Sequence, residues 1–308
     1  MNQTQKGILI KTAAIGVFAV MDACLKLLSE NYGAFQVAFF RGAAAMPFLV
    51  ALIAWNNSWR ELKTASWGFH MLRAALAVSM LASIVYAFRE LPLADAYSIF
   101  YAAPLFVVIL SVVILKESVG WHRWFALIIG LAAVLFMFQP KGVGFSLAVI
   151  ACLYSTFAYA LLVIILKWMH KTNTTTSLSF YFTLFLSIGA GLLSVFDWQP
   201  FRFEDIALVV LLGLTGGVAL LLLTEAYRLA PASSLAPFEY SSVIWAIVIG
   251  WVIWNDFPSQ VVIASSSVLV MTGLYILHRE RVHHIEPEPI TLTISHEFDG
   301  IKDESQHA

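Results

Sequence analysis

One carboxylate, Glu239, stands in a stretch of the sequence that is otherwise almost wholly apolar. The stretch SSLAPFEYSSVIWAIVIGWVIW runs from Ser233 to Trp254, and no lysine or arginine lies within ten positions of Glu239. Burial favours the neutral form of a carboxylic acid, and a nearby cation favours the charged form. Glu239 is therefore a candidate proton carrier, or a counter-ion for a positive group of a substrate. The structural alternative is a buried acid satisfied by Arg41 or by a tyrosine.

Asp22 and Arg41 are further candidates for substrate binding, because each interrupts an apolar stretch. Lys26 follows Asp22 by four residues, a spacing that suits an ion pair on one face of a helix. Arg41 comes directly after two phenylalanines. It could bind an anionic group of a substrate, pair with Asp22, or extend outward along its helix.

Tyrosines recur in the same apolar stretches, and a buried hydroxyl group needs a hydrogen-bond partner. Such rings and hydroxyls suit a planar or cationic organic solute. Plain packing in a core is the alternative. The candidate lining residues are Tyr97, Tyr101, Tyr154, Tyr159 and Tyr240.

The elements that must position these residues are long apolar runs. Of the 308 residues, 60% are hydrophobic and 12% are charged, and the mean hydropathy is +0.82. Soluble domains carry about twice this charged fraction, and apolar runs of about 18 residues or more are typical of membrane helices. We expect an all-α membrane protein with ten spans, over residues 7–28, 35–55, 67–88, 94–115, 121–139, 143–167, 176–196, 205–228, 233–254 and 258–278.

Charge indicates the orientation and excludes some classes of function. Most lysines and arginines near span ends fall on the side that holds the N-terminus, so both termini are expected in the cytoplasm. Residues 279–308 are polar and charged, and are expected to form a disordered tail.

The net charge of −1 suggests no nucleic-acid partner. Because the histidines lie at span ends or in the tail, we expect no metal site. No phosphate-binding loop and no clustered catalytic constellation is visible, so we also expect no cofactor and no enzymatic activity.

The sequence repeats itself at a shift of 139 residues, with no gap needed between Ala87 and Glu117. This repeat divides the chain into halves of five spans, over residues 7–139 and 143–278. Because five is odd, the second half must enter the membrane from the opposite side. Inverted repeats with a site at their interface are a transporter architecture. The matching positions are Ala87-Phe88-Arg89 with Ala226-Tyr227-Arg228, Pro92 with Pro231, Tyr101 with Tyr240, and Glu117 with Asp256.

The motifs LPLADAYSIFYAAP, KESVGWHRW, AYRLAPASSLAPFEY and WNDFP occur in this order. Together they resemble the drug/metabolite transporter superfamily, and more narrowly the EamA-domain carriers, over about residues 7–278. FQVAFFRG and HMLRAAL are similar to bacterial S-adenosylmethionine uptake transporters, and LPLADA and APFEY to bacterial riboflavin importers. The resemblance implies a ten-helix bundle in the bacterial inner membrane. Its central cavity would be lined by the first, third, fourth, sixth, eighth and ninth spans.

These observations predict a secondary transporter that takes up a vitamin-like or S-adenosyl-type metabolite by alternating access. Its partners would be a small-molecule substrate, the lipid bilayer and coupled protons, and a homodimer is a possible assembly. Export of amino acids or drug-like compounds is the alternative. A membrane enzyme, a sensor or a channel is less favoured, because no catalytic constellation, soluble domain or ring of charges is visible.

Overall fold

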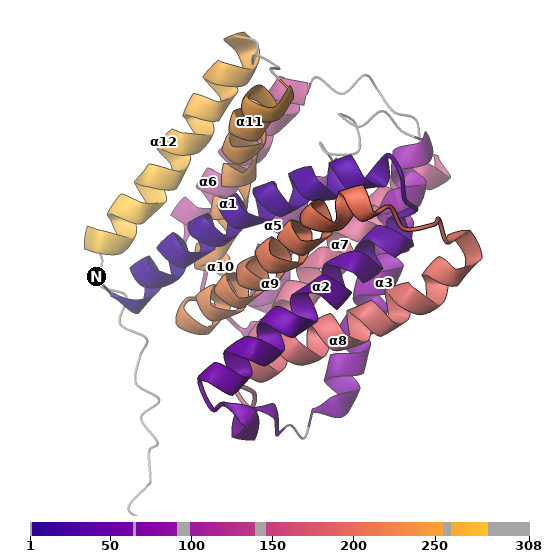
Figure 1. Cartoon of the computed structure of the whole chain (residues 1–308). Coiled ribbons are helices and arrows are strands. Elements are labelled where there is room, and N and C mark those ends of the chain that lie inside the picture. Colours follow the sequence, from indigo (N-terminus) through magenta and orange to yellow (C-terminus); the bar gives the residue numbers. More distant parts are fainter. Residues whose placement is uncertain (1, 64–65, 91–98, 139–145, 255–259, 283–308) are drawn as a thin grey trace, which may run out of the picture.

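The computed structural model describes residues 2–63, 66–90, 99–138, 146–254 and 260–282, and the regular elements in these ranges are all helices (Figure 1). The longer helices are α1 (Gln3–Ser29), α2 (Ala34–Trp55), α3 (Trp67–Glu90), α5 (Ala103–Leu115), α6 (Trp121–Phe138), α7 (Leu147–Met169), α8 (Thr175–Ser194), α9 (Ile206–Leu229), α11 (Ser241–Trp254) and α12 (Gln260–Val282). The short elements are α10 (Ala232–Leu235) and the 3₁₀ turns η1 (Trp59–Leu62), η2 (Val195–Asp197), η3 (Phe203–Asp205) and η4 (Ala236–Tyr240).

Within the described ranges, five helical segments are long and apolar enough to cross a membrane, as judged by length and composition. They are Gln3–Ser29, Ala34–Trp55, Leu147–Met169, Thr175–Asp197 and Phe203–Leu229. Large apolar side chains are exposed on the outside of the bundle, among them Leu192 at 68% and Val252 at 73%. An apolar exterior over long helices fits a lipid environment, so the chain is a multi-pass membrane protein.

Polar residues at the helix ends satisfy the backbone groups that have no partner within the helix. Asn2 accepts a hydrogen bond from the backbone N–H of Gln5 while the Gln5 side chain accepts one from the Asn2 backbone, which makes a capping box. Ser146 and Thr174 cap α7 and α8 in the simpler way, each through its hydroxyl group. The starts of α1, α7 and α8 are therefore each stabilised by a polar capping side chain.

Helices from the first part of the chain pack mainly against helices from the second part. The main contacts are α1 with α9 and α11, α2 with α8 and α9, α3 with α7 and α8, α5 with α7, and α6 with α12. In Figure 1, α1 and α9 lie along one another across the bundle, and α12 lies at one edge with α6 and α11 nearby. At Gly213, any side chain would overlap the backbone at Ala44 and Ala45 of α2, so this glycine sets how closely α2 and α9 approach.

The connections meet at two ends of the bundle. At one end, the hydroxyl of Tyr32 donates to Asp205 at 2.8 Å, and Arg202 donates to Asn31 at 2.8 Å. At the other end, Asn173 donates to Ser66 at 3.1 Å. Connections that follow odd-numbered and even-numbered predicted spans thus gather at different ends, as expected of a chain that crosses the bundle repeatedly.

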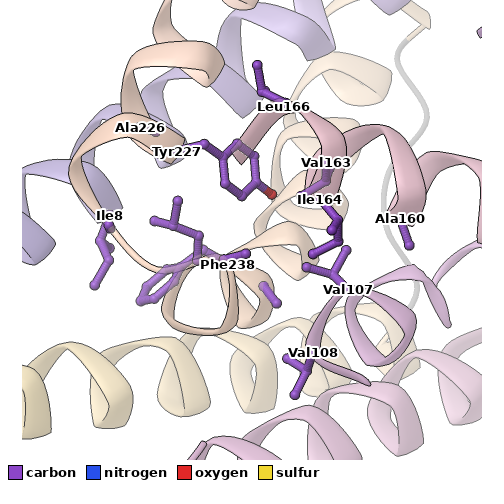
Figure 2. Packing of buried hydrophobic residues seen from close by; sticks show 14 of the residues in the cluster. Ile8, Val107, Val108, Ala160, Val163, Ile164, Leu166, Ala226, Tyr227 and Phe238 are labelled. Carbon is purple, nitrogen blue, oxygen red and sulfur yellow. The ribbon is translucent and has the colours of Figure 1, made fainter. Parts of the chain in front are cut away.

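The largest buried cluster lies where α5, α6, α7 and α9 meet η4. Figure 2 shows Tyr227 of α9 and Phe238 of η4 in this cluster, with Val163 and Ile164 of α7 and Val107 of α5. This core holds η4 in place, and η4 carries Glu239.

Two predicted boundaries need correction. The predicted span 233–254 is not one continuous α-helix: α10 gives way to the 3₁₀ turn η4 before α11 begins at Ser241. Pro237 lies in the first positions of η4, where its missing N–H fits a helix start better than a helix interior. At the other boundary, α12 continues to Val282, four residues beyond the predicted limit of 278. The remainder of the predicted tail lies outside the described residues.

Candidate functional site

Glu239 lies in the interrupted part of the predicted ninth span and forms a buried ion pair with Lys11 of α1. The Lys11 Nζ atom donates to Glu239 Oε1 at 2.7 Å and to the Tyr227 hydroxyl at 2.6 Å. The Tyr159 hydroxyl of α7 donates to the same Oε1 atom at 2.5 Å. The Lys11 side chain is 0% exposed and that of Glu239 is 15% exposed. We call these four residues the Lys11–Glu239 cluster.

The cluster joins helices that are far apart in the sequence. Lys11 comes from α1, Tyr159 from α7, Tyr227 from α9 and Glu239 from η4. The Lys11 ammonium group also lies 4.5 Å from the centroid of the Tyr227 ring, a cation–π distance. Removing one partner of a buried ion pair leaves an uncompensated charge, which costs about 3–5 kcal/mol. Loss of either charge would therefore destabilise the contact between α1 and η4.

Charged side chains also fix the connection between α9 and α11. Glu117 accepts hydrogen bonds from the backbone N–H groups of Ala232 and Ser233, at 2.9 and 3.0 Å, and from the Ser233 hydroxyl at 2.7 Å. At the other side of the turn, Lys167 donates to the backbone carbonyls of Tyr227 and Ala230, both at 2.6 Å. The acidic Glu117 thus lies at the start of α10 and the basic Lys167 at the end of α9, which is the arrangement that the helix dipole favours.

The predicted fourth span is also interrupted, at the position that the sequence repeat equates with η4. Phe100 is helical, Tyr101 and Ala102 form a turn, and α5 begins at Ala103. Tyr101 and its repeat mate Tyr240 lie next to one another, with ring centroids 6.4 Å apart. Both predicted spans therefore break at the same repeated tyrosine.

The candidate tyrosines have different environments. Tyr240 is 2% exposed, and its hydroxyl donates to the Leu127 carbonyl at 3.2 Å. Tyr101 accepts a hydrogen bond from Ser242 at 3.3 Å. Tyr154 is 41% exposed and shares a hydrogen bond of 2.8 Å with Ser79. Of the predicted lining residues, only Tyr159 joins the Lys11–Glu239 cluster among those described, and Tyr97 lies outside the described residues.

Asp22 and Arg41 are close enough to attract one another, and lie apart from the Lys11–Glu239 cluster. Each is the other's charged neighbour, so Lys26 is not the charge that compensates Asp22. The Arg41 guanidinium group lies 5.9 Å from the ring centroid of Phe18 on α1. Of the structural partners considered for Glu239, Arg41 is wrong, since the cation that Glu239 contacts is Lys11.

Lys11 is the residue that sequence reasoning missed. It falls inside the predicted span 7–28, close to the end that is predicted to face the cytoplasm. Its partner Glu239 is 228 positions away, so no local pattern relates the two. One signal was present: Lys11 and Asp22 are separated by eleven residues, which is about three helical turns, so they share one face of the helix.

Several known transporters are similar to this chain over most of its length. Residues 5–139 match the EamA-like transporter family. The S-adenosylmethionine uptake transporter of Rickettsia prowazekii is 26% identical over 264 residues, which cover 85% of this chain and 89% of the relative. The riboflavin transporter of Vibrio cholerae is 23% identical, covering 85% and 90%. The pseudopaline exporter CntI of Pseudomonas aeruginosa is 24% identical, covering 91% and 99%.

A solved crystal structure has the same fold. It matches with a TM-score of 0.78 at 15% sequence identity, and the match covers 90% of this chain and 99% of the other. The family match and the similar transporters indicate a membrane transporter rather than an enzyme. More narrowly, residues 5–139 match the EamA-like transporter family, and the transporters named above are similar to most of the chain. This confirms the family predicted from the sequence motifs.

Proposed function

We propose that this protein is a secondary transporter that takes up a vitamin-like or S-adenosyl-type metabolite by alternating access. In this proposal two inverted repeats of five helices, over residues 7–139 and 143–278, move relative to one another around a site at their interface. The bacterial inner membrane is its location, with both termini and the tail in the cytoplasm. Coupling to protons and assembly as a homodimer stay predictions.

The pattern of helix contacts supports the inverted repeat. The repeat equates α1 with α7, α2 with α8, α3 with α9, α5 with α11, and α6 with α12. Exchanging the members of these pairs turns the α1–α9 contact into α7–α3, the α2–α9 contact into α8–α3, and the α5–α7 contact into α11–α1. All of these contacts are present. The pairs α2–α8 and α6–α12, which map onto themselves, are in contact as well.

The observation that carries the proposal is the buried Lys11–Glu239 pair at an interrupted helix. Transporters of inverted-repeat design place their sites at discontinuous helices in corresponding positions of the two halves. Here the interruptions fall at Tyr101 and Tyr240, the repeat mates, and Glu239 lies directly before the second of them. An ionisable pair in this place is expensive to bury, so it points to function rather than to stability alone.

The geometry suggests how the pair would take part in transport. With both groups charged, Lys11 bonds Glu239 and closes α1 onto η4. A proton on Glu239 would remove the attraction and leave Lys11 with the Tyr227 hydroxyl. The pair would then separate, and the space between α1 and η4 would open. Rejoining of the pair, with loss of the proton, would close it again.

The relatives support a small organic solute, in either direction. Those described as S-adenosylmethionine uptake transporters favour uptake of an S-adenosyl-type metabolite, and the one described as a riboflavin transporter supports a vitamin-like solute. The relative described as a pseudopaline exporter supports the opposite direction, so export of amino acids or drug-like compounds is the second candidate.

Proteoliposomes test the proposal. Purified protein is reconstituted and assayed with labelled S-adenosylmethionine, riboflavin and a set of amino acids, with and without a pH gradient. We expect saturable uptake of at least one solute, and we expect Glu239→Gln to abolish accumulation or its dependence on the gradient. Glu204→Gln, which removes an exposed acid in η3, is the matched control. Wild-type rates and gradient dependence in Glu239→Gln would refute the proposed role of the pair, and the absence of any transport would refute the function.

A further inference from the structure

We infer that Asp22 and Arg41 form a subsite for an α-amino acid head group, with Asp22 binding its ammonium group and Arg41 its carboxylate. The inference rests on the proposed transport function and narrows its substrate class. The proposed subsite is distinct from the Lys11–Glu239 cluster, in which the two charges already pair with one another.

Asp22 is exposed, although it lies in a membrane-spanning helix, and the helix geometry shows which way it faces. Leu9 and Val20 are 49% and 39% exposed and form the outer apolar face of α1. At roughly 100° per residue, Asp22 lies nearly opposite these two, on the face that carries Lys11. That face is closed around Lys11, which is 0% exposed, and open around Asp22. The carboxylate therefore faces the protein side of the helix rather than lipid.

Arg41 lines a small cavity between α2, α8 and α9. The other residues that line it include Gly42 and Ala45 of α2, Phe182 and Thr183 of α8, and Gly216 of α9. The Arg41 side chain runs closely over Gly216, where an added Cβ atom would lie 3.3 Å from two of its atoms. The absence of a side chain at position 216 thus lets the guanidinium group pass between the helices.

Both charged groups keep their hydrogen-bonding capacity free within the part of the chain that the structure describes. Neither Asp22 nor Arg41 hydrogen-bonds a described residue through its side chain, and they form no ion pair with one another, although their charges attract. By contrast, Lys11, Glu239, Glu117 and Lys167 each have two or more hydrogen-bond contacts with protein atoms.

The chemistry of the two groups selects the ligand. A guanidinium group binds a carboxylate through a planar fork of N–H donors, and a carboxylate accepts hydrogen bonds from an ammonium group. A solute that carries both groups on one carbon would place one charge at each residue and leave no net charge unpaired in the bundle. A solute without such a head, such as a neutral ring system, would leave both residues unsatisfied, which is costly in a site away from water.

The test compares two neutral thioethers that differ in this head group. S-adenosylhomocysteine carries an α-amino acid head, whereas 5′-methylthioadenosine ends in a methyl group at the same sulfur. Their binding to the full-length protein in detergent is measured by isothermal titration calorimetry. We expect the wild type to bind the first at least about tenfold more tightly, the effect of charge-assisted hydrogen bonds. Asp22→Asn and Arg41→Gln should each reduce this preference below about threefold.

Exposed residues supply the controls: Glu30→Gln at the end of α1 and Arg60→Gln in η1 should keep the wild-type preference. If a neutral variant is not monodisperse in gel filtration, the charge-retaining variants Asp22→Glu and Arg41→Lys replace it. For these we expect an affinity ratio of the two thioethers that lies between the wild-type ratio and a ratio of one. Equal binding of the two thioethers, binding of neither, or an unchanged preference in the variants would overturn the inference. Transport of riboflavin by a protein without this preference would refute the subsite alone, whereas the preference without any transport would refute the proposed function alone.

Discussion

Replacing Glu239 by Gln removes one charge from an ion pair whose lysine is fully buried and whose glutamate is 15% exposed. Lys11 is 0% exposed, so it cannot turn to water without moving α1 away from η4. Its remaining partners are the Tyr227 hydroxyl at 2.6 Å and the new amide oxygen. Because these neutral acceptors do not compensate the ammonium charge, the folded protein must bear that charge or lose the proton from Lys11.

The structure gives the size of the effect. Removing one partner of a buried pair costs about 3–5 kcal/mol, and the retained amide oxygen places this case at about 3 kcal/mol, the lower end. For a chain of this length, each kcal/mol lowers Tm by about 2–4 °C, so we expect Tm to fall by about 6–12 °C. Cys24 and Cys152 are both buried thiols, so a thiol-reactive dye reports unfolding in detergent without further labels.

A second variant separates charge pairing from packing. Lys11→Met combined with Glu239→Gln removes both charges, and we expect it to recover most of the stability that Glu239→Gln loses. The double-mutant cycle should give a coupling energy of about 1–3 kcal/mol. A fall in Tm below about 2 °C for Glu239→Gln, or a double variant whose loss equals the sum of the two single losses, would show that the pair is not coupled in this way.

Three further predictions follow from the same geometry. A cysteine at Asn57 should react with an impermeant reagent only from the cytoplasm and one at Asn31 only from outside; the reverse pattern would overturn the orientation. Tyr240→Phe should lower the free energy of unfolding by about 0.5–1.5 kcal/mol, because a backbone carbonyl of α6 loses its bond, and an unchanged Tm would contradict this. Gly213→Ala should cost about 1–3 kcal/mol through overlap with α2, whereas Gly120→Ala, which has nothing within 4 Å, should behave like the wild type in the same melt.

The class of fold could be predicted from the sequence because hydrophobicity and length determine it locally. The first span was expected at 7–28 and α1 runs over Gln3–Ser29; the second was expected at 35–55 and α2 runs over Ala34–Trp55. Burial of backbone groups in lipid leaves a long apolar run little choice but a helix. The interruption at η4 was less predictable, since Pro237 signals only a helix start and the 3₁₀ turn depends on the surrounding core.

The candidate site could be predicted only in part. Glu239 and Tyr159 stood out by their residue types, and the structure brings them into contact. The pairing with Lys11 could not be deduced, because an ion pair between α1 and η4 depends on how distant helices pack. For the same reason, the sequence left both Lys26 and Arg41 as charged partners for Asp22, and the structure places its charge near that of Arg41 on the next helix.

The way in which the two parts of the chain interleave has a consequence for its synthesis. The surfaces of α1, α2, α3 and α6 that contact α9, α8, α7 and α12 have no covering until those later helices exist. A ribosome that has made only the first 138 residues has therefore delivered helices to the membrane whose partners are still to come. Charged side chains such as Lys11 must wait in the bilayer or its interface for a partner made 228 positions later. Insertion and folding of this protein are thus separate events, and the final structure forms when the last helices of the bundle arrive.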